Sequence, residues 1–207
     1  AGAGNDSLVD VPTNGSEVDT GLGGQVRGNY CTWNPLLRNP SGTNAAPTNG
    51  NLDGRGDTGA TYAYGCGGTL AMPNSGKWYF EVTISSRGDY AWVGVAPTSS
   101  VFENEMYAIK DGRSYRSDGQ KALGAGGTSV TNSSYGAAYT SGDTIGVALD
   151  LDAGTLVFYK NGTSQGTAFS SVSGNFIPTA FGYNGTTFTA NFGQRPFAYT
   201  APSGFKA

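Results

Sequence analysis

The glutamates are the residues of this chain best suited to acid–base chemistry, because the 207-residue sequence contains no histidine. Without histidine, a Ser-His-Asp triad, a Cys-His pair and every histidine metal site are excluded. A glycosidase needs two carboxyl groups about 5 to 9.5 Å apart across the sugar. Glu81 shares its strand face with Tyr79 and Thr83, whereas Glu103 and Glu105 are spaced to share one face. The sequence therefore predicts no catalytic residues, with glycoside hydrolysis at Glu103 and Glu105 as the disfavoured alternative.

Two aspartates, Asp150 and Asp152, flank a glycine-containing turn. Alternating aspartates are able to ligate Ca²⁺ through oxygen, but an aspartate at a turn more often bonds to its own backbone. We therefore expect neither a metal site nor a cofactor.

The two cysteines, Cys31 and Cys66, are able to form at most one disulfide. Their separation in the sequence does not determine whether they meet. Two free, buried thiols are the favoured interpretation, because unpaired cysteine behaves as a small apolar core residue. A disulfide between Cys31 and Cys66 is the alternative interpretation.

Tyrosines gather at the expected strand ends and in the Gly- and Ser-rich connections. This composition is typical of recognition surfaces, because tyrosine offers a large contact area at a low cost in entropy. Arg113 and Arg116 lie beside Tyr115 in the sequence and add hydrogen-bond donors. An equally good interpretation is that the tyrosines pack beneath loops or cover sheet edges. The candidate ligand-binding residues are Tyr90, Tyr107, Arg113, Tyr115, Arg116, Tyr135 and Tyr139.

The elements that must position these side chains are β-strands. Apolar residues alternate with other residues over 76–84, 145–151 and 156–159, which predicts three strands with one face in a core. Asn161-Gly162 then gives the strongest short-range signal for a hairpin turn. Weaker patterns predict further strands over 62–70, 90–96, 114–116, 176–183 and 187–192.

The composition indicates a neutral, turn-rich chain, since it contains 34 glycines and 9 prolines and only 13% charged residues. The net charge of −3 and the absence of a basic run argue against binding to nucleic acid. No apolar stretch approaches the ~20 residues that cross a bilayer, so membrane insertion is not expected.

Three regions are expected along the chain. Residues 1–58 form an extended, loop-rich N-terminal segment, residues 59–197 form the β-sandwich, and residues 198–207 form a C-terminal tail that trails off. Within the sandwich, residues 123–139 are rich in Gly, Ser, Thr and Tyr, and we expect a long exposed loop with little core content there.

Six sequence blocks follow one another between residues 76 and 197 in an order that resembles the SPRY family. The blocks are GKWYFEVTI, WVGVA, YRSDGQK, GDTIGVALDLDAGTLVFYKNG, FIPTAFGYNG and ANFGQRPF. The resemblance implies an all-β fold, a bent antiparallel β-sandwich with a lectin-like jelly-roll shape. It also implies a non-enzymatic interaction module whose loops at one edge of the sandwich take a protein partner.

The N-terminal stretch AGAGNDSLVDVPTNG, followed by GNYCTWNPL, is similar to segments that precede SPRY domains in structural proteins of bacteriophages. This similarity implies a virion or extracellular location in a tail fibre or other appendage. The expected partners are a protein or glycan receptor or other virion subunits, and a homo-oligomer such as a trimer is one expected form. The alternatives are a carbohydrate-binding, lectin-like domain and a capsid-decorating protein.

Overall fold

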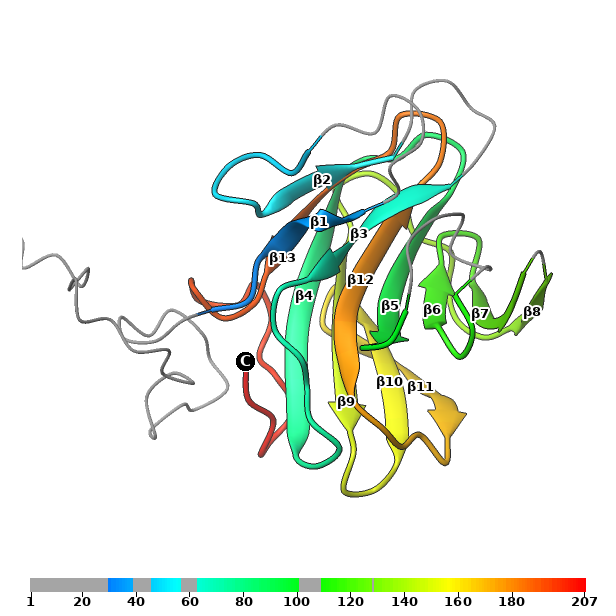
Figure 1. Cartoon of the computed structure of the whole chain (residues 1–207), viewed down its shortest axis with the longest axis vertical. Coiled ribbons are helices and arrows are strands. Elements are labelled where there is room, and N and C mark those ends of the chain that lie inside the picture. Colours follow the sequence, from blue (N-terminus) through cyan, green and yellow to red (C-terminus); the bar gives the residue numbers. More distant parts are fainter. Residues whose placement is uncertain (1–29, 39–45, 57–62, 101–108, 128) are drawn as a thin grey trace, which may run out of the picture.

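The computed structural model describes residues 30–38, 46–56, 63–100, 109–127 and 129–207. These residues form 13 β-strands in two antiparallel sheets, one of seven strands and one of six (Figure 1). The predicted all-β sandwich is therefore confirmed. Within the described ranges, no helix has the length and hydropathy needed to cross a membrane.

The strand order of each sheet differs from the order of the chain. The seven-stranded sheet runs β1 (Trp33–Arg38), β3 (Tyr64–Gly68), β12 (Phe176–Gly182), β5 (Ala91–Pro97), β6 (Arg113–Arg116), β7 (Gln120–Gly126) and β8 (Ser129–Ser134). The six-stranded sheet runs β11 (Thr163–Ser170), β10 (Thr155–Lys160), β9 (Thr144–Asp150), β4 (Lys77–Ser86), β13 (Thr187–Asn191) and β2 (Asp53–Arg55).

The predicted meander forms the centre of the six-stranded sheet. Phe80 of β4, Val147 of β9 and Phe158 of β10 lie side by side in register across three neighbouring strands. Asn161 and Gly162 have φ values of 48° and 78°, so both adopt the left-handed conformation that a two-residue hairpin turn requires. The strand alternation and the Asn-Gly turn were both predicted correctly.

The hydrophobic core lies between the two sheets. Val82, Val147 and Phe158 of the six-stranded sheet belong to the same buried cluster as Val93 and Val95 of the seven-stranded sheet. Each of these side chains is at most 1% exposed. Period-two alternation therefore identifies the residues that join the sheets, because one face of each strand enters the core.

Two short strands from the expected N-terminal segment complete the sheet edges. β1 pairs with β3, and β2 pairs with β13. Trp33 joins the two strands, because its main-chain N–H donates to Asn51 O at 2.8 Å and its indole N–H donates to Leu52 O at 2.9 Å. The domain boundary expected at residue 59 therefore falls after two strands that belong to the sandwich.

The last ten residues do not trail off, contrary to the expectation from the sequence. Lys206 O accepts a hydrogen bond from Tyr79 N at 2.6 Å, and Lys206 N donates to Lys77 O at 2.9 Å. The tail thus lies beside β4 (Figure 1). It covers the face of β4 opposite the core, so Tyr79 and Glu81 are each only 2% exposed. The sequence of the tail contains no strand pattern that would predict this contact with β4.

The expectation of a long exposed loop over residues 123–139 is wrong. The chain forms β7 and β8 there, joined by a turn containing Gly126 and Gly127, both with positive φ. β8 is exposed along almost its whole length. Because neither face of this strand enters the core, its sequence of mainly Ser, Thr and Asn lacks the alternation of apolar residues that predicts a strand. Hydrogen bonding to β7, rather than burial, makes it a strand.

Both cysteines are free and buried, which agrees with the favoured interpretation. Cys31 lies beside Thr69, whose hydroxyl points to the Cys31 sulfur at 3.8 Å, whereas Cys66 pairs in register with Arg38 and Ala180. Burial raises the pKa of the Cys66 thiol to about 12. Both thiols act as small apolar core groups.

Candidate functional site

An aromatic and cationic surface forms where β5 begins and β6 ends. The rings of Tyr90 and Trp92 have centroids 5.8 Å apart, and Arg116 Cζ lies 5.0 Å from the centroid of the Tyr90 ring. Tyr90 is 40% exposed, while Trp92 and Arg116 are partly buried. We call these three residues the Tyr90–Trp92–Arg116 surface.

The antiparallel pairing of β5 and β6 explains this grouping. Trp92 is the register partner of Arg116, so their side chains project from the same face of the seven-stranded sheet. Trp92 also packs against a second apolar cluster on that face, which contains Ala96, Ile177 and Phe181. The indole is therefore anchored on one side and accessible on the other.

Asp118, in the turn after β6, holds the Arg116 guanidinium in place. Arg116 Nε donates to Asp118 Oδ1 at 2.8 Å, and Nη2 donates to Asp118 Oδ2. This two-point contact fixes the plane of the guanidinium. The hydrogen bond from Arg116 lowers the pKa of Asp118 below its ordinary value.

Acid is expected to break the Arg116–Asp118 pair only below the ordinary aspartate range. Because the folded pKa of Asp118 is lowered, the pair contributes to stability above the unfolded value of about 3.9, and this contribution is lost as the pH falls through the folded value. A carboxyl-carbon NMR titration should give an Asp118 midpoint below 3.9, and Arg116→Gln should raise that midpoint. An unchanged midpoint in the variant would contradict the pairing.

The turn between β12 and β13 borders the same surface. Tyr90 O accepts hydrogen bonds from Tyr183 N and from the Thr186 hydroxyl, each at 2.9 Å. Asn184 Nδ2 donates to Asp89 Oδ2 at 3.2 Å. A Cβ at position 88 would overlap the main-chain oxygen of Asn184, so this close approach requires Gly88.

Buried polar groups beneath the surface fix the ends of β5 and β6. Ala91 N donates to Ser117 Oγ at 3.1 Å, and Ser117 N donates to Ala91 O at 2.9 Å. The Tyr139 hydroxyl lies 3.0 Å from Ala91 O and 2.8 Å from Tyr115 O. These contacts hold the residues on either side of the exposed Tyr90 ring in one arrangement.

Tyr115 and Tyr139 are core residues rather than surface contacts. They are 0% and 1% exposed, and their ring centroids lie 5.0 Å apart. Tyr135, which is partly buried, packs edge-on against Tyr115 at 5.2 Å and donates its hydroxyl proton to Gly166 O at 2.6 Å. Burial raises the pKa of Tyr115 and of Tyr135 to about 12. The interpretation that tyrosines pack beneath loops thus holds for this group.

The remaining candidates do not join the Tyr90–Trp92–Arg116 surface. Arg113 and Arg116 are three residues apart on β6, so their side chains point to opposite faces of the sheet. Arg113 lies over the ring of Phe176, a core residue. Tyr107 lies outside the described residues. Of the predicted residues that the structure describes, only Tyr90 and Arg116 belong to this surface, whereas Tyr115, Tyr135 and Tyr139 form a separate buried group.

Trp92 was missed from the candidate residues, although the sequence carried a signal for it. Val93 and Val95 point into the core from β5, so the alternation places Trp92 on the opposite face. A tryptophan on the non-core face of a strand has both a large apolar area and a polar N–H, which makes it a common interface residue.

The carboxylates of Glu81 and Asp150 have structural roles. Glu81 accepts hydrogen bonds from Ala198 N at 2.7 Å and Tyr199 N at 2.9 Å. Asp150 Oδ1 accepts from the amides of Asp152 and Ala153, and Asp150 Oδ2 lies 3.1 Å from Lys77 Nζ. The ranges that the structure covers contain no group of three or more acidic or cysteine side chains able to hold a metal ion. Glu103 and Glu105 lie outside those ranges.

The geometry of the Tyr90–Trp92–Arg116 surface is suited to non-covalent recognition. Two rings supply apolar area with few rotatable bonds, and the guanidinium supplies fixed donors beside them. Hydrogen bonds between the main chain of Tyr90 and Ala91 and the side chains of Thr186 and Ser117 fix the backbone at this surface.

Comparisons with known proteins agree on one family. The SPRY domain family matches residues 77–195. Ran-binding protein 9 of Danio rerio is 34% identical over 128 residues, which is 60% of this chain and 21% of that protein. The Ran-binding proteins 9/10 homolog of Drosophila melanogaster is 33% identical over 132 residues, which is 62% of this chain and 13% of that protein. The chain thus matches about a fifth or less of the length of these relatives.

Solved structures show the same fold. The crystal structure of the SPRY domain of human HERC1 superposes with a TM-score of 0.60 at 19% identity, covering 76% of this chain and 96% of that one. A second human SPRY domain gives a TM-score of 0.51 at 22% identity, covering 63% and 85%. The relatives named here are animal proteins and give no support to the bacteriophage assignment, which stays a prediction.

Proposed function

The chain belongs to the SPRY domain family, and from this premise we propose that it is a non-catalytic module that binds a protein partner through the Tyr90–Trp92–Arg116 surface. The observation that carries the proposal is the exposed Tyr90 ring, which contacts the Trp92 ring and has the Arg116 guanidinium over its face. Tyrosine, tryptophan and arginine are the residues most enriched among those that dominate binding energy at protein interfaces.

The rigidity of the surface supports the proposal. Ordering an interface side chain on binding costs about 0.5–1.5 kcal/mol. Here Asp118 already orders Arg116, and the second apolar cluster already orders Trp92. Binding a partner therefore costs little additional side-chain conformational entropy at this surface.

The test is a peptide-display selection on the wild-type chain, followed by calorimetry of the selected peptides with variants. Tyr90→Ala and Trp92→Ala are each expected to weaken binding by about 10-fold or more, because each removes a large preordered ring. Arg116→Gln should weaken binding as well and should change its dependence on salt.

Tyr199→Ala is the matched control. Tyr199 is 36% exposed, close to the 40% of Tyr90, but its backbone bonds to Glu81 on the other sheet. Its substitution should leave the affinity unchanged. Peptides that bind Tyr90→Ala and Trp92→Ala as tightly as wild type would disprove the role of this surface.

A glycan ligand is the alternative that the same two rings favour, since exposed aromatic rings stack on sugars. A glycan array probed with wild type and Tyr90→Ala separates the two functions. Glycan binding that Tyr90→Ala abolishes, with no peptide selected, would favour the lectin-like alternative.

We also propose, as a finer assignment, a place for the chain in a virion appendage outside the cell. The similarity of the N-terminal stretch to segments of bacteriophage structural proteins supports it. The test is light scattering of the chain with and without residues 1–29, which leaves β1 and β2 in place. A trimer that becomes a monomer on truncation is the expected result, and a monomer in both forms would count against the assignment.

A further inference from the structure

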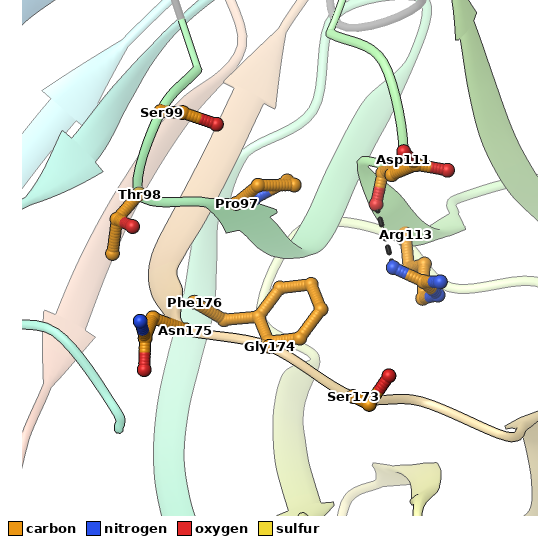
Figure 2. Close-up of a pocket in the computed structure, with 9 residues that line it drawn as sticks. All are labelled: Pro97, Thr98, Ser99, Asp111, Arg113, Ser173, Gly174, Asn175 and Phe176. Atoms are coloured by element: carbon orange, nitrogen blue, oxygen red, sulfur yellow. Dashed lines mark hydrogen bonds between the residues drawn. The ribbon is translucent and has the colours of Figure 1, made fainter. Parts of the chain in front are cut away.

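A concave site lies at the end of β5 opposite Tyr90. It is a pocket of about 390 Å³ bounded by the end of β5, the start of β12 and the segment that enters β6 (Figure 2). β5 rises about 3.3 Å per residue, so the pocket lies roughly 20 Å from Tyr90. It is therefore separate from the Tyr90–Trp92–Arg116 surface and does not depend on the function proposed for that surface.

Among the described residues, Arg113 is the only one with a cationic side chain that lines this pocket. Its Cζ lies 5.3 Å from the centroid of the Phe176 ring, and its Nη1 donates to the main-chain oxygen of Asp111 at 2.8 Å. A guanidinium has five N–H donors. Within the described part of the chain, the Asp111 contact uses one of them, so several donors face the pocket without a protein acceptor.

Arg113 forms no salt bridge among the described residues, although the nearby charge of Asp111 favours its charged form. The salt bridges found there pair Lys77 with Asp150, Arg116 with Asp118 and Lys160 with Asp143. Figure 2 shows the carboxylate of Asp111 turned away from the guanidinium, which its main-chain oxygen faces instead. Burial lowers the pKa of Arg113, although the side chain stays charged.

The other groups around the pocket add donors on a fixed frame. Thr98, Ser99 and Ser173 contribute hydroxyl groups to its lining. The rim is held by Asn74, whose N–H donates to Asn175 Oδ1 at 2.9 Å and whose Oδ1 accepts from Gly174 N at 2.6 Å. The described lining thus places three hydroxyl groups in the same pocket as the Arg113 guanidinium.

The aromatic ring beneath Arg113 excludes a sugar as the preferred ligand. Phe176 is 2% exposed and has the guanidinium over its face, so it offers no free ring surface for stacking. A ligand of this pocket must instead supply hydrogen-bond acceptors and a negative charge.

We propose that this pocket binds the carboxylate of an aspartate or glutamate side chain presented by an acidic peptide, with Arg113 donating two hydrogen bonds to its oxygens. The planar fork of arginine matches the two oxygens of a carboxylate. The nearby hydroxyl groups then donate hydrogen bonds to the remaining lone pairs of the carboxylate oxygens. The ligand carboxylate forms with Arg113 the salt bridge that the described residues do not supply.

The test is a two-dimensional amide NMR titration of the full chain with two blocked tripeptides that have either aspartate or asparagine between two glycines. The aspartate peptide is expected to shift the amides of Thr98, Ser99 and Gly174 and to bind about 10-fold more tightly than the asparagine peptide. Equal binding of the two peptides, or binding of neither, overturns the proposal.

Acetate is titrated as a third ligand to separate a peptide from a free carboxylate. The peptide is expected to bind more tightly than acetate, because its main chain reaches the hydroxyl groups at the rim. Acetate binding as tight as that of the aspartate peptide overturns the assignment to a peptide.

Arg113→Gln tests the residue itself, with Arg87→Gln as the matched control. Arg87 is an exposed arginine at the opposite end of the sandwich, so its loss removes the same charge away from the pocket. Binding of the aspartate peptide should be lost in Arg113→Gln and kept in Arg87→Gln. Arg113→Lys, which keeps the charge without the fork, should bind about 10-fold more weakly than wild type. Full binding by Arg113→Gln overturns the proposal.

Discussion

Removal of residues 198–207 is expected to lower the free energy of unfolding by about 4 kcal/mol. The deletion leaves the Glu81 carboxylate without the amide donors of Ala198 and Tyr199. It also uncovers Tyr79 and Ala148, which pack against Ala201 of the tail in one buried cluster. Loss of hydrogen bonds to a buried charge costs about 1.5–3 kcal/mol each, and the exposed apolar area adds to this.

Urea unfolding followed by tryptophan fluorescence measures the loss. Lys206→Ala is the control, because the Lys206 side chain is exposed and its contacts to β4 are made by the main chain. That variant should change stability by less than about 0.5 kcal/mol. A truncated chain as stable as wild type would show that the tail does not support the sheet.

Trp33→Ala is expected to lower the free energy of unfolding by about 4 kcal/mol. The Trp33 ring is fully buried and packs edge-on against Phe188 at 5.7 Å and Phe192 at 5.0 Å. Its indole N–H also satisfies Leu52 O. The substitution therefore opens a cavity and removes one of the two hydrogen bonds to Leu52 O, which also accepts from Ala190 N at 2.9 Å. The cavity accounts for most of the expected loss.

Trp78→Ala is the matched control for this prediction. Trp78 donates its indole N–H to Ser75 O at 2.9 Å, the same distance as in Trp33, but its ring is only partly buried. Its loss should cost about 1–2 kcal/mol. If urea unfolding gives equal losses for the two tryptophans, burial of Trp33 does not hold the N-terminal strands in place.

Local patterns made the central strands predictable. The alternation over 76–84 and the Asn161-Gly162 turn depend on residues that are close in the sequence, so period and turn chemistry specify them. β1 and β2 were missed, because Trp33 and Asp53 enter the sheets only through partners far along the chain. The docked tail was missed for the same reason.

The candidate site was only partly predictable, because composition does not report burial. Tyr90 and Tyr139 both sit among Gly, Ser and Ala residues, yet one is 40% exposed and the other is 1% exposed. The difference arises from the sheet, since Tyr139 reaches back to the carbonyl groups of Ala91 and Tyr115. Such contacts join residues 24 and 48 positions apart, which no local window contains.

The strand order determines when the sandwich is able to fold during synthesis. β12 lies between β3 and β5, and β13 lies between β2 and β4, so neither sheet is continuous until residues 176–191 have been synthesised. Pairings of such long sequence separation slow folding. A ribosome-bound chain that stops before residue 176 therefore lacks β12, which joins β3 to β5, and β13, which joins β2 to β4. The sandwich is able to close only after these two strands have been synthesised.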